Sequence, residues 1–101
     1  MLTLPIKKKW FDMIKSGKKK EEYREIKPYY TSRFRKYDVR ADYYNPTDEI
    51  IFRNGYSKNS PSIKCKCEIA MDYGNPEWGA RIGEIYYVLK ILSVEEINDN
   101  N

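Results

Sequence analysis

The clearest alternation of apolar and charged residues in the chain runs from Ser62 to Met71. One face of this stretch carries Ile63, Cys65, Cys67, Ile69 and Met71. The other face carries Lys64, Lys66 and Glu68. Successive side chains point to opposite faces of a strand, so the pattern predicts a half-buried antiparallel strand. The run from Glu84 to Val94 is apolar on both faces, which predicts a central strand.

Three more segments have the character of strands, namely residues 1–6, 19–26 and 48–53. Between the first two, apolar residues recur at the spacing of one helix face, and Gly17 follows where a helix commonly ends. The residues of this face are Ile6, Trp10, Met13 and Ile14. A second, short helix is predicted from Pro28, because proline suits the first helical position. Its side chains would include Tyr29, Tyr30, Arg33, Phe34 and Tyr37.

The remaining segments are dominated by turn residues. Residues 38–47 have no clear pattern, apart from a turn signal at Asn45-Pro46. Asn54-Gly55 predicts another turn, which leads into a polar loop. Residues 72–79 (DYGNPEWG) are predicted to form a loop that carries one large aromatic side chain, Trp78.

About five strands and one or two helices, with short connections, predict a small α+β fold. We expect the sheet to close into a β-barrel, since closure removes exposed strand edges, with helices flanking it. The 101-residue length fits one domain, which we place at residues 1–97. Residues 98–101 are expected to be a frayed tail.

The amino-acid composition limits the partners and the catalytic groups that this chain can use. Lys and Arg exceed Asp and Glu by 19 to 15, which mildly favours an anionic partner, nucleic acid before membrane. Histidine is absent, so acid–base work falls to Lys, Glu, Asp or Tyr. Cys65 and Cys67 are one residue apart, too far along a strand for an easy disulfide and too few to hold zinc. We therefore expect reduced core thiols, no metal, no cofactor and, without a signal or membrane segment, a cytoplasmic protein.

The densest alternation of charge lies at residues 16–24 (SGKKKEEYR), between the first predicted helix and the second strand. Glu22 and Arg24 are two apart and should project from one face of that strand, joined by Lys20 if the strand begins early enough. Such a row is suited to holding a polar ligand. The alternative is a solvated edge strand whose charges protect it from aggregation.

The same stretch resembles a known family. Gly17, Lys19, Glu22 and Arg24 fit the G-x-K-x-x-E-x-R signature of the ASCH domain family, which belongs to the PUA-like superfamily. The order of strand, helix, Gly-Lys turn and charged strand is similar too. Residues 53–56 (RNGY) and 74–79 (GNPEWG) look like segments of the small phage-type and bacterial branch.

The resemblance implies a small PUA-like barrel with a cleft between helix and barrel, lined by the signature residues. It implies binding of RNA or modified nucleobases, and in some members RNA cleavage or removal of acetyl groups from N4-acetylcytidine. The deacetylase branch has a catalytic threonine where this chain has Glu22. That activity is therefore not carried over.

Two functions follow as hypotheses. The first is binding of single-stranded RNA or of a flipped or free nucleobase, by charged groups and by aromatic rings that stack on bases. Its candidate ligand-binding residues are Gly17, Lys19, Glu22, Arg24, Asn54, Tyr56, Asn75 and Trp78. The second is a hydrolase acting on RNA or a modified nucleoside, with Lys19 as general acid/base or electrostatic clamp and Glu22 as base. For Lys19 and Glu22 the alternative is an ion pair that only orders the strand, and for the chain as a whole a protein-binding accessory role.

Overall fold

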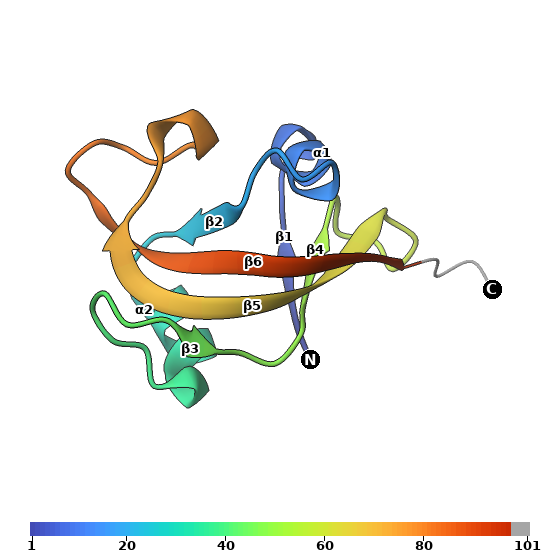
Figure 1. Ribbon diagram of the computed structural model, residues 1–101. Helices are drawn as coiled ribbons and strands as arrows, with labels where there is room; N and C mark the ends of the chain where they lie inside the picture. The colour runs from blue at the N-terminus through green and yellow to red at the C-terminus, as the bar shows by residue number, and fades with distance from the viewer. Residues whose placement is uncertain (98–101) are drawn as a thin grey trace.

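The computed structural model describes residues 1–97, and the predicted tail at 98–101 lies outside this range. The elements in chain order are β1 (Leu2–Pro5), α1 (Lys8–Lys15), β2 (Glu21–Arg24), α2 (Pro28–Phe34), the 3-10 helix η1 (Arg35–Tyr37), β3 (Asn45–Pro46), β4 (Ile50–Arg53), β5 (Ser62–Tyr73), the 3-10 helix η2 (Pro76–Trp78) and β6 (Ile85–Ile97). The predicted α+β class is confirmed. A single curled sheet is flanked by α1 and α2 (Figure 1).

The sheet has the strand order β1-β4-β5-β6-β2. β1 pairs in parallel with β4, and the pairs β4–β5, β5–β6 and β6–β2 are antiparallel. The long strands β5 and β6 curve together across the molecule (Figure 1). The register between them shifts at a bulge between Lys66 and Cys67. A bulge bends the strand that carries it, which helps the sheet to curl.

One predicted turn is instead a strand. Asn45 and Pro46 form β3, which pairs antiparallel with Ile69 and Glu68 of β5 and raises the number of strands within residues 1–97 to six. Proline lacks the N–H group that a strand between two partners needs, so it is confined to sheet edges. β3 meets that condition, because it pairs with β5 alone.

The main core fills the inside of the curled sheet. The fully buried sheet residues include Ile50, Phe52, Ile63, Cys65, Ile69 and Leu89. α1 contributes Phe11 and Ile14, and α2 contributes Phe34. Phe11 was not among the apolar helix positions predicted from the sequence. Trp10, which was, is only partly buried and packs at the margin of this core.

The second strand is shorter than predicted, and this matters for the site. β2 begins at Glu21, so Lys20 precedes it and is exposed. Lys19 is buried instead, since its backbone N–H bonds to the Met13 carbonyl of α1 at 3.0 Å and directs the chain inward. The charged face therefore carries Lys19 in place of Lys20.

Candidate functional site

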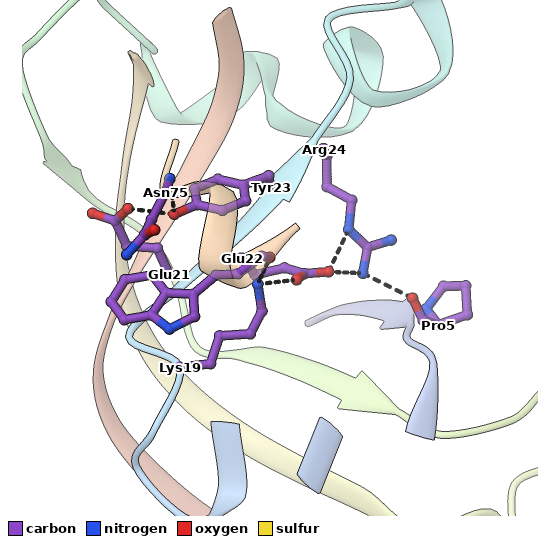
Figure 2. Close-up of polar contacts among 8 residues, drawn as sticks. Pro5, Lys19, Glu21, Glu22, Tyr23, Arg24 and Asn75 are labelled. Carbon is purple, nitrogen blue, oxygen red and sulfur yellow. Dashed lines mark hydrogen bonds and ion pairs between the residues drawn. The ribbon is translucent and has the colours of Figure 1, made fainter. Parts of the chain in front are cut away.

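A row of three charged side chains lies buried at β2. Lys19, Glu22 and Arg24 are 1%, 6% and 8% exposed. Glu22 stands between the two cations, with Oε1 at 3.3 Å from the Lys19 Nζ and Oε2 at 2.7 Å from the Arg24 Nη2 (Figure 2). The Arg24 Nε also donates to Glu22 Oε2, at 3.1 Å. Both oxygens of the carboxylate are thus engaged, and the guanidinium is oriented by two bonds to one oxygen.

Arg24 joins the two ends of the strand order. Its Nη2 donates to the Pro5 carbonyl oxygen at 2.8 Å, so a side chain of β2 is hydrogen-bonded to the backbone of β1 (Figure 2). These are the first and last strands of the sheet path. Its Nη1 donates to the Tyr30 hydroxyl of α2 at 3.2 Å. The guanidinium therefore ties together three elements that are separate in sequence.

Burial sets the electrostatics of this row. Two cations share one carboxylate, so the cluster carries an excess positive charge away from water. Burial lowers the pKa of Lys19 below its ordinary value of 10.5, because the charged amine loses its hydration. The nearby Glu22 carboxylate opposes that shift. An anionic group placed next to this cluster would relieve the imbalance.

A pocket of about 400 Å³ opens over the same face. Its floor includes Glu22 and Arg24, one side is formed by Lys7 and Trp10 at the start of α1, and Tyr30 of α2 borders it. The β5–β6 connection forms another wall, with the lining residues Trp78, Gly79, Arg81 and Glu84. Four parts of the chain therefore meet around one cavity.

Aromatic rings and rim charges give the pocket its character. The aromatic lining residues are Trp10, Tyr23, Tyr30, Trp78 and Tyr86. The lining cations are Lys7, Arg24, Lys27 and Arg81, and the lining acids are Glu22, Glu25 and Glu84. Lys19 does not line the pocket but lies within its wall, with its amine 4.8 Å from the ring centroids of both Trp10 and Tyr23. The cavity thus combines flat apolar surfaces with an excess of positive charge.

The structure brings some of the predicted site residues together and separates others. Glu22, Arg24 and Trp78 line the pocket. Gly17 follows α1 with a φ of 83° and ends the helix as predicted, without lining the pocket. Asn54 and Tyr56 lie in the β4–β5 loop, away from the pocket lining, and Tyr56 is 94% exposed. A part for these two loop residues in ligand binding stays a prediction.

Asn75 has a structural setting at the start of η2. Its side-chain oxygen accepts from the Glu77 N–H at 2.9 Å and so caps the 3-10 helix. Its own N–H donates to the Tyr23 hydroxyl at 2.8 Å. Asn75 does not line the pocket, although it helps to shape the segment that does.

Sequence reasoning missed Trp10, Tyr23, Tyr30 and Arg81 as lining residues. The sequence pattern predicts Trp10 on the apolar face of the first helix and Tyr30 on an aromatic face of the second, and such a pattern alone does not separate a core ring from one at a pocket margin. Tyr23 carried a usable signal, since it sits inside the signature stretch. Nothing in the sequence around Arg81 relates it to Arg24.

The row is poorly suited to proton transfer with a ligand. The Lys19 amine donates to the Trp78 carbonyl oxygen at 2.7 Å and pairs with Glu22. Both Glu22 oxygens face a cation. Among residues 1–97, no group of three or more Cys, Asp or Glu side chains is placed to hold a metal ion. The amine of Lys19 and both oxygens of Glu22 are thus engaged by other groups of the protein.

Comparisons with protein-family models, with curated proteins and with solved structures found no match to this chain. Within residues 1–97, no helix has the length and apolar character needed to cross a membrane.

Proposed function

We propose that this protein binds RNA or a nucleotide through the pocket above Glu22 and Arg24, as the signature of the ASCH domain family implies. The observation that carries the proposal is a cavity walled by aromatic rings, in which the lining cations outnumber the acids and the buried pair Glu22 and Arg24 forms part of the floor. A base has a flat face that stacks on such rings, worth about 1–3 kcal/mol per base. Its edge offers the hydrogen-bonding atoms that charged groups recognise.

The floor supports recognition of a base edge. Glu22 accepts two N–H bonds from Arg24, which fixes the guanidinium in one orientation. Arg24 also donates to Pro5 and Tyr30. A donor group that is already positioned loses little conformational freedom when a ligand arrives. Arg24 and the Tyr30 hydroxyl are therefore the groups we assign to the ligand edge.

The rim supports recognition of a phosphate. Lys7, Lys27 and Arg81 are exposed cations around the opening. Contacts of this kind release counterions, so the binding constant falls as salt rises. The acidic Glu25 and Glu84 also line the pocket, and they would repel a ligand that carries many negative charges.

A titration with short single-stranded RNAs and with nucleoside monophosphates, repeated at several salt concentrations, tests the proposal. Tryptophan emission is a direct readout, since Trp10 and Trp78 both line the pocket. Trp78→Ala should weaken binding by about 5- to 150-fold, the equivalent of one stacked base. Tyr43→Ala is the matched control, because Tyr43 is an exposed tyrosine that does not line the pocket.

Three outcomes would count against the proposal. One is the absence of binding to every RNA and nucleotide tested. Another is an affinity that does not change with salt. The third is an equal loss in Trp78→Ala and Tyr43→Ala, which would place the ligand outside the pocket. Adding Tyr56→Ala to the series decides whether the β4–β5 loop takes part.

A further inference from the structure

The β5–β6 connection is held against the sheet by side chains that bond to its backbone. The Lys19 amine donates to the Trp78 carbonyl oxygen at 2.7 Å. The Tyr23 hydroxyl accepts from the Asn75 N–H at 2.8 Å, and the Tyr86 hydroxyl accepts from the Arg81 N–H at 2.9 Å. The connection supplies Trp78 and Arg81 to the pocket wall. These three bonds therefore determine where that wall stands.

Lys19 is unusual among them because its charge is enclosed. It is 1% exposed and does not line the pocket. The amine lies 4.8 Å from the ring centroids of Trp10 and of Tyr23, and its polar contacts are the Trp78 carbonyl and Glu22. A ligand in the pocket would contact the Trp10 and Tyr23 rings that cover Lys19, whereas the amine keeps its bonds to the Trp78 carbonyl and Glu22.

The contacts of Lys19 form one continuous polar chain. It runs from the Trp78 carbonyl through Lys19, Glu22 and Arg24 to the Pro5 carbonyl. Figure 2 shows the part of this chain from Lys19 to Pro5. One end holds the connection that carries Trp78, and the other end holds β1. The same chain therefore positions the stacking wall and the guanidinium on the pocket floor.

Close packing supports the same reading of this wall. A Cβ atom added at Gly79 would lie 3.0 Å from the Trp10 ring, and the φ of 100° at Gly79 is one that glycine adopts readily. The chain thus passes directly against the indole of α1, next to the residue whose carbonyl Lys19 holds. The position of Trp78 is thus fixed by the hydrogen bond from Lys19 to its carbonyl and by the close packing of Gly79 on Trp10.

We infer that Lys19 is a positioning residue, which fixes the Trp78 segment and orients Arg24 through Glu22 without touching the ligand itself. Measuring RNA affinity in a Lys19 variant rests on the proposed function. Measuring the position of Trp78 does not, because it needs no ligand.

The test uses protein labelled with 5-fluorotryptophan, which gives one ¹⁹F resonance for Trp10 and one for Trp78. The Trp10→Phe variant keeps the Trp78 resonance alone and so assigns both. Lys19→Met keeps an unbranched side chain that reaches as far as the Lys Cε and removes the amine, and it should shift the Trp78 resonance of the free protein. Lys27→Met is the matched control, since Lys27 is an exposed cation on the pocket rim. It should leave that resonance unchanged.

The salt dependence of binding to a short single-stranded RNA separates positioning from contact. Each phosphate contact adds about 0.7 to the slope of log affinity against log salt for a single strand. Lys19→Met should weaken binding while keeping the wild-type slope, and Lys27→Met should reduce the slope. A Lys19→Met protein with an unmoved Trp78 resonance, or with a slope reduced like that of Lys27→Met, overturns the inference.

Tyr23→Phe keeps the test decisive if Lys19→Met does not fold. It removes the hydroxyl that accepts from the Asn75 N–H and keeps the ring beside Lys19. The Trp78 resonance should move, and an unmoved resonance would show that side-chain bonds to the connection do not set its position. If wild-type protein binds no RNA, the proposed function fails, and the free-protein resonances still decide the role of Lys19.

Discussion

Glu22 is the side chain whose replacement tests the buried row most directly. Its carboxylate contacts both the Lys19 amine and the Arg24 guanidinium, and all three side chains are buried. Glu22→Gln preserves the size of the side chain and removes the negative charge. Two cations then share the site with no anion between them.

The expected loss of stability is large. Removing one partner of a buried ion pair costs about 3–5 kcal/mol, because the remaining charge stays desolvated and unpaired. Domains have a total stability of about 5–15 kcal/mol, so this is a substantial share. For a domain of about 100 residues, each kcal/mol lowers Tm by roughly 4–8 °C, which gives a decrease of about 12–40 °C.

The loss should depend on pH, and its sign follows from Lys19. Burial lowers the pKa of Lys19 below 10.5, and Glu22 raises it in the wild type, so the variant should have a still lower Lys19 pKa. Between that value and 10.5 the unfolded chain binds more protons than the folded one, and stability rises with pH. The difference in stability between variant and wild type should therefore shrink as pH is raised from 7 towards 10.

Urea unfolding followed by circular dichroism at several pH values measures this difference. The titration of Lys19, followed by NMR of ¹³C-labelled lysine, reports its pKa in both proteins. Glu25→Gln is the matched control, since Glu25 neighbours Arg24 in sequence and is exposed. A Glu22→Gln protein that is as stable as Glu25→Gln, or a Lys19 pKa that does not fall in the variant, would contradict this role of Glu22.

Two further predictions concern the core and the β5–β6 connection. Burial raises the pKa of Cys65 from 9.0 to about 12 and raises that of Cys67 as well, so thiolate at pH 8 should be roughly a thousandfold scarcer at Cys65 than in the unfolded chain. A thiol reagent should therefore react slowly with folded protein and rapidly in guanidinium chloride, and equal rates would contradict this. A Cβ atom at Gly74 would lie 2.6 Å from the Ala80 Cβ and 2.8 Å from the Tyr23 ring, so Gly74→Ala should destabilise the protein by about 1–3 kcal/mol through overpacking. A thermal melt checks it, and an unchanged Tm would show that the segment yields without cost.

Local periodicity is enough to predict several elements of this fold. The alternation in residues 62–71 predicted the half-buried strand that became β5, and the helix-face spacing before Gly17 predicted α1. The i, i+2 spacing of Glu22 and Arg24 placed both on one face of a strand, and β2 has them buried on that face. Each of these properties is set within a few residues, where backbone geometry leaves little choice.

The surroundings of Glu22 and Arg24, in contrast, come from residues far away in the sequence. Lys19 is buried because the chain turns back against α1 before β2 begins, and the wall over it comes from the β5–β6 connection, far along the sequence. Arg24 reaches Pro5 because the curled sheet brings its first and last strands close to each other. Strand order and loop docking depend on contacts between distant residues, and no local pattern records them. The pocket therefore depends on the curl of the whole sheet, and its charged floor depends on the local stretch of residues 22–24.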